Sequence, residues 1–279
     1  MSQQLLLCTD LDRTLIPNGP EPESPQARAK FRKLVQLPQV TLVYVTGRHL
    51  SLTKEAIEQY QLPTPNFILS DVGSTIYQMV SGQWHSWQNW ENEIAPDWGN
   101  RGRADIEALF HSFSELQLQE PSKQNLYKVS YYTPLHINQQ KLVERMKLAL
   151  EQAGIKASVI HSIDKPAAVG LLDILPAKAT KYHAIEFLME RLGFSLATTV
   201  FAGDSGNDLP VLVSPIHSVL VANATVEVRT QAQQQSRFKD NSASLYCATG
   251  NYPGMNGNYS AGILEGIIHY IPDVKEWLK

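Results

Sequence analysis

Short apolar runs recur along the chain, each followed by glycine or polar residues, and segments with helical periodicity lie between them. The apolar residues stand on consecutive positions, which is typical of strands buried on both faces of a parallel sheet. The runs are Leu5 to Thr9, Val40 to Val45, Asn66 to Leu69, Thr199 to Ala202 and Val219 to Ala222. Because strands and helices alternate, the sequence predicts a doubly wound parallel α/β sheet with right-handed crossovers.

Helices can be predicted from periodicity and from the residues at their ends, and a short one is expected at 52–60. Ser24 is placed as an N-cap with Pro25 at the first helical position. Residues 181–192 carry apolar residues on one face and stop at Gly193, a typical C-cap. A last helix is expected at 261–270.

The middle of the chain breaks this rhythm, with helix and strand signals that favour a separate α+β unit. The signals are a helix at 103–116, a strand at 127–133, a helix at 138–153 and extended pieces at 157–163 and 169–175. The sequence therefore predicts two domains. Residues 1–82 and 174–279 form the parallel-sheet domain, and residues 83–173 form an insertion.

Composition narrows the function classes. Hydrophobic residues make up 43% of the 279 residues, enough for a sizeable core, and the formal net charge is -3. This charge gives no footprint for nucleic acid or an anionic membrane. Two cysteines provide no disulfide framework, the N-terminal segment does not resemble a secretion signal, and no stretch reaches the ~20 apolar residues of a membrane span. A cytoplasmic location is expected.

The segment DLDRT, directly after the first run, places Asp10 and Asp12 two positions apart. Because side chains alternate along a strand, we expect both carboxylates to point the same way at its carboxyl end. Two close like charges need a cation or a shared proton, and Mg²⁺ is the simplest compensator. An Asp-x-Asp pair also occurs in ordinary turns, so this motif alone leaves that interpretation open.

Three further segments favour a phosphate and metal site. GDSGND at 203–208 follows another strand and supplies carboxylates with glycines that permit tight turns. Thr46, Gly47 and Arg48 end a third strand with a hydroxyl, free backbone amides and a cation, which suit phosphate oxygens. Lys181 begins a helix, so its ammonium can lie beside an anion at the sheet edge.

Together the motifs DLDRT, TGR, Lys181 and GDSGND, in this order, resemble those of the haloacid dehalogenase (HAD) superfamily of phosphotransferases. The resemblance implies a HAD-like Rossmannoid core. The large insertion between the second and third motifs is similar to that superfamily's C2-type cap, of the B subtype.

A closer resemblance is to the sucrose-6-phosphate phosphatases of cyanobacteria and plants, and it extends from about residue 5 to residue 270. It rests on VTGR, SDVGSTIY, YKVSYY, LLDILP, GDSGNDLPVL, VANA and SAGILEGIIHY. Kanosamine-phosphate and mannosylfructose-phosphate phosphatases share much of this layout. The chain departs from the sucrose phosphatases at Arg13, where they carry a small polar residue, and in the stretch 162–170.

The resemblance implies a chemical role for both aspartates of the first motif. Asp10 would be the nucleophile that attacks phosphorus and becomes an aspartyl-phosphate, which suits a carboxylate because it is ionised at neutral pH. Asp12 would protonate the departing sugar oxygen and then activate water for the second step.

The resemblance also implies a magnesium cofactor and a phosphate-binding set. The metal ligands would be the Asp10 and Asp204 carboxylates and the Asp12 backbone carbonyl, supported by Asp208, Asn207 and Ser205. Thr46 and Lys181 would bind the phosphoryl oxygens during catalysis, and Gly47 and Arg48 would contact the phosphate or the sugar. Lys128, Tyr131 and Lys165 of the insertion could face the substrate or could be packing residues.

The leading hypothesis is a Mg²⁺-dependent phosphoric monoester hydrolase that converts sucrose 6-phosphate to sucrose and phosphate. One alternative is a phosphatase for mannosylfructose phosphate or kanosamine phosphate. A phosphomutase would use the same aspartyl-phosphate but return the phosphate to sugar. A non-catalytic partner of a sugar-phosphate synthase is a further alternative, and that synthase is also a possible partner of the enzyme.

Overall fold

The computed structural model describes residues 4–164 and 167–278. The chain divides into two compact units. The first unit comprises Met1–Gly73, Tyr77–His85 and Lys181–Lys279, and the second comprises Ser74–Ile76 and Ser86–Thr180. The sequence placed the boundaries after residues 82 and 173, whereas the division falls after His85 and Thr180, because one strand continues the first sheet and another continues the second.

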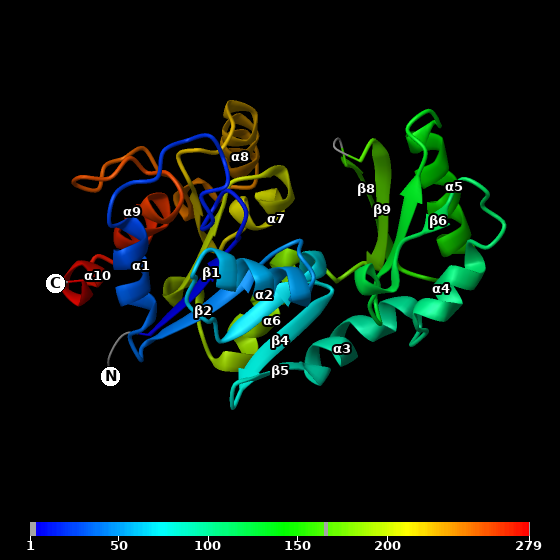
Figure 1. Ribbon diagram of the computed structural model, residues 1–279, viewed down its shortest axis with the longest axis horizontal. Helices are drawn as coiled ribbons and strands as arrows, with labels where there is room; N and C mark the ends of the chain where they lie inside the picture. The colour runs from blue at the N-terminus through cyan, green and yellow to red at the C-terminus, as the bar shows by residue number, and fades with distance from the viewer. Residues whose placement is uncertain (1–3, 165–166, 279) are drawn as a thin grey trace. The chain divides into compact units, whose positions relative to one another are not determined.

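An eight-stranded sheet forms the centre of the first unit, in the order β12-β11-β10-β1-β2-β3-β4-β5 (Figure 1). The strands are β1 Leu5–Thr9, β2 Val40–Val45, β3 Phe67–Ser70, β4 Thr75–Val80, β5 Gln83–Ser86, β10 Thr199–Gly203, β11 His217–Leu220 and β12 Leu245–Cys247. From β12 to β3 every neighbouring pair is parallel, which confirms the predicted parallel sheet. The hairpin of β4 and β5 was not predicted. Its two turn residues, Ser81 and Gly82, have φ angles of 49° and 80°, as a type I′ turn requires.

Helices cover both faces of this sheet. They are α1 Ala27–Val35, α2 Leu50–Gln59, α6 Lys181–Leu192, α7 Leu209–Leu212, α8 Val226–Phe238, α9 Ser260–Tyr270 and α10 Val274–Trp277. Leu5 and Leu7 of β1 share a core with α1, α2 and α9, while α6, α7 and α8 contact one another in sequence (Figure 1). Leu6 and Cys8 alternate with Leu5 and Leu7 and are equally buried, so β1 is covered on both faces.

The predicted α6 agrees with the structure, but the cap predicted for α1 is wrong. Helix α1 begins at Ala27, with Gln26 in the N-cap position. The Ser24 hydroxyl instead donates to Asn256 Oδ1 at 2.7 Å, which ties this turn to the segment before α9. The Ser24 side chain, which the local pattern predicted as a helix cap, therefore forms a tertiary hydrogen bond instead.

The path of the chain across the sheet changes direction between β1 and β10, which are themselves parallel. The chain proceeds from β1 to β2 and β3 on one side, and β10, β11 and β12 occupy the other. The amide of Asp10 donates to the carbonyl of Ala202 at 2.9 Å, so the carboxyl ends of β1 and β10 lie next to each other. In open α/β sheets, ligands bind in the crevice at such a switch point.

The second unit is a four-stranded antiparallel sheet, in the order β6-β7-β9-β8, with three α-helices. Its elements are β6 Gln117–Leu118, β7 Val129–Thr133, β8 Ala157–Asp164, β9 Val169–Pro176, α3 Gln88–Ile94, α4 Arg103–Leu109 and α5 Gln139–Gln152. Trp98, fully buried, lies in its core with Ile106, Val129 and Met146. None of the helices within residues 4–164 and 167–278 combines the length and the apolar character that crossing a membrane requires.

Gly266 of α9 allows this helix to approach the sheet, because a Cβ at Gly266 would lie 2.5 Å from Cγ1 of Val219 in β11. In an exposed helix, Gly→Ala would stabilise by up to about 1 kcal/mol. Overpacking typically destabilises by about 1–3 kcal/mol, so we expect Gly266→Ala to lower the free energy of unfolding. Urea denaturation followed by circular dichroism measures this. Gly206→Ala, with no neighbour within 4 Å, is the control, and an equal loss in both variants would contradict the packing argument.

Candidate active site

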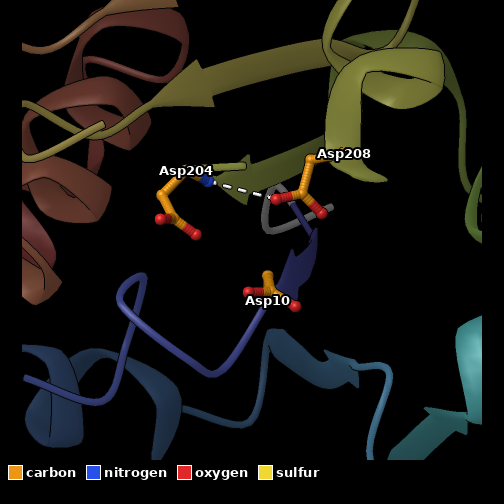
Figure 2. Close-up of side chains that lie close together, drawn as sticks. All are labelled: Asp10, Asp204 and Asp208. Carbon is orange, nitrogen blue, oxygen red and sulfur yellow. Dashed lines mark hydrogen bonds between the residues drawn. The ribbon is translucent and has the colours of Figure 1, made fainter. Parts of the chain in front are cut away.

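The carboxyl edge of the sheet gathers the acidic residues predicted from the sequence. Asp10 follows β1 directly, Asp204 follows β10, and Asp208 lies one turn further along the same loop. All three are buried, with 6%, 5% and 0% of their surface exposed. One carboxylate oxygen from each lies within 4.8 Å of the others, and Figure 2 shows the three side chains around a common space.

Lys181, the first residue of α6, supplies a buried positive charge to this cluster. Its Nζ donates to Asp10 Oδ1 at 2.8 Å and to Asp208 Oδ1 at 2.7 Å, with Asn207 Oδ1 at 3.2 Å. Burial alone would lower the pKa of Lys181, but the charges of Asp10 and Asp208 outweigh it and raise that pKa. The ammonium is therefore held in its charged form.

One ammonium does not balance three carboxylates. Burial is the main cause that raises the pKa of Asp10; Lys181 opposes it, and Asp208 and Asp204 add to it. Burial and then Asp208 likewise raise the pKa of Asp204 from 3.8 to about 6. A divalent cation would favour the ionised forms, and oxygen ligands at this spacing suit Mg²⁺. Asp10, Asp204 and Asp208 are the residues that could hold such an ion.

The loop after β10 fixes Asp208 through its own backbone. Asp208 Oδ2 accepts hydrogen bonds from the Asp204 amide, the Ser205 amide and Ser205 Oγ, each at 3.1 Å. Figure 2 shows the first of these bonds. A Cβ at Gly203 would lie 2.6 Å from Cγ of Asp208, so only glycine leaves room for this carboxylate. Ser205 Oγ also donates to Asn207 Oδ1 at 2.8 Å, so two of the three predicted supporting residues contact each other within the loop.

Asp12 lies beyond β1, which ends at Thr9, and the expected common direction of Asp10 and Asp12 stays a prediction. The Asp12 carboxylate forms a two-pronged ion pair with Arg48, with Nε at 2.8 Å and Nη2 at 2.7 Å. Partial burial opposes its ionisation, but Arg48 and then Asn18 outweigh this and lower the pKa of Asp12.

Thr46 lies at the predicted position after β2 and is buried. The expectation of free backbone amides fails at two positions, because the Thr46 amide donates to the Leu69 carbonyl at 2.8 Å and the Arg48 amide to Thr46 Oγ1 at 3.1 Å. Asp71 and Val72 form a turn with positive φ angles. The Asp71 amide donates to the Arg48 carbonyl, and the Val72 amide donates to the Thr46 carbonyl. These two bonds fix the segment Thr46-Gly47-Arg48.

The predicted substrate residues of the second unit have different surroundings. Tyr131 belongs to the core of that unit, 5% exposed, with its ring edge-on to Phe110, so its surroundings give no support for contact with a substrate. Lys128 precedes β7 and is buried beside Asn125, with which it forms a β-bridge. Lys165 lies outside the described residues.

Two residues with direct contacts to the site were not singled out from the sequence. Thr14 Oγ1 donates to Asp204 Oδ1 at 3.1 Å, and Asn18 Nδ2 donates to Asp12 Oδ1 at 2.8 Å. Thr14 stands within the first motif, and Asn18 lies in a Pro-Asn-Gly turn. The sequence therefore indicates that a hydroxyl and a turn are present. It does not indicate the partner of Thr14, which is 190 residues away.

Known proteins resemble the chain over its whole length. A family model described as sucrose-6F-phosphate phosphohydrolase matches residues 3–271. A protein of Nitrosococcus oceani described as a HAD-like hydrolase is 50% identical over all of this chain and 75% of its own length. The mannosylfructose-phosphate phosphatase of Agrobacterium fabrum is 26% identical over 95% of this chain and 96% of its own. Sucrose-phosphatase 1 of Nicotiana tabacum is 28% identical, and the chain spans 59% of that protein.

Among solved structures, the sucrose-phosphatase of Synechocystis, in complex with sucrose and phosphate, superposes with a TM-score of 0.70 at 26% identity. The match covers 96% of this chain and 98% of that one. A haloacid dehalogenase-like hydrolase of Bacillus subtilis, 19% identical, has the same fold with a TM-score of 0.66. The chain belongs to the sucrose-6F-phosphate phosphohydrolase family of the haloacid dehalogenase superfamily, and it is a phosphoric monoester hydrolase.

Proposed function

We propose that this hydrolase uses Mg²⁺ to release phosphate from sucrose 6-phosphate. The observation that carries the proposal is the similarity to the Synechocystis sucrose-phosphatase, which covers 98% of that chain and so includes both units. The family model, at residues 3–271, supports the same class of substrate. The acidic cluster at the switch point of the sheet supplies groups suited to this chemistry.

In the proposed mechanism Asp10 attacks phosphorus and the bond to the sugar oxygen breaks, leaving an aspartyl-phosphate. Lys181, at 2.8 Å from Asp10, holds the attacking carboxylate and offers its charge to the phosphoryl oxygens. Water then attacks the aspartyl-phosphate and regenerates Asp10. Thr46, buried directly after β2, would donate its hydroxyl hydrogen to a phosphoryl oxygen.

Asp12 would give a proton to the departing sugar oxygen and take one from the attacking water. With Arg48 bound to both of its oxygens, Asp12 is ionised in the substrate-free protein. Because an acid must carry a proton, Arg48 has to loosen its hold on Asp12 before the first step. The substrate's phosphate is an alternative partner for this guanidinium, which gives Arg48 a role in both binding and proton transfer.

HAD phosphatases generally use Mg²⁺, and the donors here fit such an ion because they are buried carboxylate oxygens that lie within 4.8 Å of one another. Asp10, Asp204 and Asp208 would hold it, together with the backbone carbonyl of Asp12. When bound, the ion supplies positive charge to the phosphoryl group and relieves repulsion among the aspartates.

Mannosylfructose phosphate is the second candidate substrate. The Agrobacterium enzyme named for it matches 95% of this chain and 96% of its own length. A cytoplasmic location and a partnership with the synthase that makes the ester remain predictions from the sequence.

A phosphate-release screen over sugar phosphates tests the proposed reaction. We expect sucrose 6-phosphate to give the highest kcat/KM, with free phosphate and sucrose as products. Asp10→Asn should lower kcat by at least about 10³-fold because the amide is not a nucleophile. Asp240→Asn, on an exposed turn after α8, should leave activity unchanged. Preference for mannosylfructose phosphate would select the second candidate, and an isomeric sugar phosphate without free phosphate would indicate a mutase.

Arg48 should set the basic limb of the kcat/KM profile, which reports the free enzyme. Because Arg48 lowers the pKa of Asp12, Arg48→Met should raise that pKa. Asp12 must be protonated to give a proton to the departing sugar oxygen, so the basic limb of kcat/KM should move to higher pH. Arg48→Lys keeps the charge and should shift the limb less. Profiles of kcat/KM that coincide for all three proteins would contradict the role given to Asp12.

Magnesium should stabilise the protein more at neutral than at acidic pH. The raised pKa of Asp204, from 3.8 to about 6, means that the folded protein binds more protons than the unfolded chain in this window. Without metal, this group therefore makes stability fall as pH rises from about 4 to about 6. Mg²⁺ competes with those protons, so the rise in Tm on adding Mg²⁺ should be larger at about pH 7.5 than at about pH 5. Asp204→Asn should remove most of this difference, and an equal rise at both pH values would count against metal binding here.

A further inference from the structure

Arg13 belongs to the first motif, and its side chain reaches the acidic cluster. Its Nε lies 3.4 Å from Asp204 Oδ2 in an ion pair. Thr14, the next residue, donates to the other oxygen, Oδ1, at 3.1 Å. Two consecutive residues of one loop therefore bind the two oxygens of the Asp204 carboxylate, one through an ion pair and the other through a hydrogen bond. Each carboxylate oxygen has two lone pairs, so both remain able to bind a cation.

The guanidinium of Arg13 is itself fixed by two acceptors. Its Nη2 donates to Glu21 Oε1 and to the backbone carbonyl of Asn223, both at 3.1 Å. Asn223 returns a hydrogen bond, because its Nδ2 donates to the Arg13 carbonyl at 2.6 Å. The loop that follows β1 is thereby joined to the loop that follows β11.

A third segment, at the start of α9, completes this arrangement. The Tyr259 amide donates to Asn223 Oδ1 at 2.9 Å, and the Tyr259 hydroxyl donates to Glu21 Oε2 at 3.1 Å. We call Arg13, Glu21, Asn223 and Tyr259 the Arg13 clamp. Arg13 and Glu21 form an ion pair, so their charges neutralise each other. The members of the clamp come from three loops that are far apart in the sequence.

The backbone is held in uncommon conformations to form this clamp. Tyr259 has φ 49° and ψ -132°, a combination that residues other than glycine rarely adopt, and Arg13 has φ 57°. Such strained residues persist where their surroundings hold them, and they gather at functional sites. Gly19 adds a second sign of close fit, because a Cβ there would lie 2.6 Å from Glu21 Oε2 and 2.7 Å from Arg13 Nη1.

We propose that Arg13 is a positioning residue for the metal site, which holds Asp204 in the orientation that binds Mg²⁺. The inference rests on the proposed function only in that Asp204 is a metal ligand. Groups that orient metal ligands commonly change metal affinity by about 10- to 100-fold when they are removed. Arg13 acts on the ion through Asp204.

A positive charge near a divalent cation would by itself weaken metal binding. In this clamp Glu21, at 3.1 Å, opposes the charge of Arg13. What remains is the directional hold on Asp204, and this favours binding. The two effects have opposite signs, so the change in Mg²⁺ affinity after the loss of Arg13 tells them apart.

The test is isothermal titration of Mg²⁺ into the full-length, metal-free protein, without substrate. Arg13→Met, which keeps length but loses the charge and the donors, should weaken Mg²⁺ binding about tenfold. Arg13→Lys, which can still pair with Asp204, should recover part of that loss. Glu21→Gln should weaken binding in the same direction, and it tests the clamp if Arg13→Met fails to fold.

Arg28→Met is the matched control. Arg28 forms a comparable ion pair with Glu23 at 2.8 Å, within the same stretch of chain. The described contacts of Arg28 are with Glu23 and the Tyr60 carbonyl. Its loss should leave Mg²⁺ affinity unchanged. In kinetic assays, Arg13→Met should raise the Mg²⁺ concentration for half-maximal rate about tenfold, with kcat at saturating Mg²⁺ within about threefold of the unmodified enzyme.

Unchanged or tighter Mg²⁺ binding in Arg13→Met would overturn this inference alone, because the unmodified protein would still bind the ion. Equal weakening in Arg28→Met would overturn it too, by assigning the effect to the segment as a whole. An unmodified protein that binds no Mg²⁺ would overturn both the proposed metal site and the role of Arg13.

Discussion

The buried ammonium of Lys181 is the interaction on which the acidic cluster depends. It lies 2.8 Å from Asp10 and 2.7 Å from Asp208, and it is 2% exposed. Removing one partner of such a buried pair typically costs about 3–5 kcal/mol, because the other charge is left uncompensated. Without this ammonium, Asp10 would lose the charge that opposes the rise of its pKa on burial. The same ammonium therefore serves both folding and the proposed phosphoryl transfer.

The switch point of the sheet brings the parts of the site together. Asp10 and Asp204 follow neighbouring strands, and the hydrogen bond from the Asp10 amide to Ala202 fixes their spacing. Lys181 is the first residue of α6, which follows the second unit in the sequence. A parallel sheet places all its carboxyl ends at one edge, so this convergence follows from topology. The sugar-phosphate chemistry of the family is thus built on a feature shared with unrelated α/β folds.

The parallel sheet could be predicted because its buried strands are continuous apolar runs, and the acidic residues could be located because they directly follow those runs. The partner of each side chain could not. Asp12 pairs with Arg48, 36 residues away in the sequence, and no local pattern indicates this ion pair. Helix α8 was missed because its buried side chains are only Ala232 and Ser236, which give a weak apolar period.

Tyr131 illustrates how the alternation of side chains along a strand decides which residues pack in a core. Val129 and Tyr131, two positions apart on β7, point into the same core, and the residue between them, Ser130, donates to Asp173 instead. The sequence left open whether Tyr131 faces the substrate or packs. Its position in the alternation places it in the core of the second unit.

The position of β1 at the centre of the sheet has a consequence for synthesis on the ribosome. Its five residues are fully buried between β2 and β10, yet β10 begins only at Thr199. At about 5–20 residues per second, the N-terminal strand waits on the order of 10–40 s for its second neighbour. During that interval one edge of an apolar strand is unpaired and open to aggregation. A nascent chain of this kind is a natural client for chaperones, and its enzymatic activity would report that the last-made strands have docked.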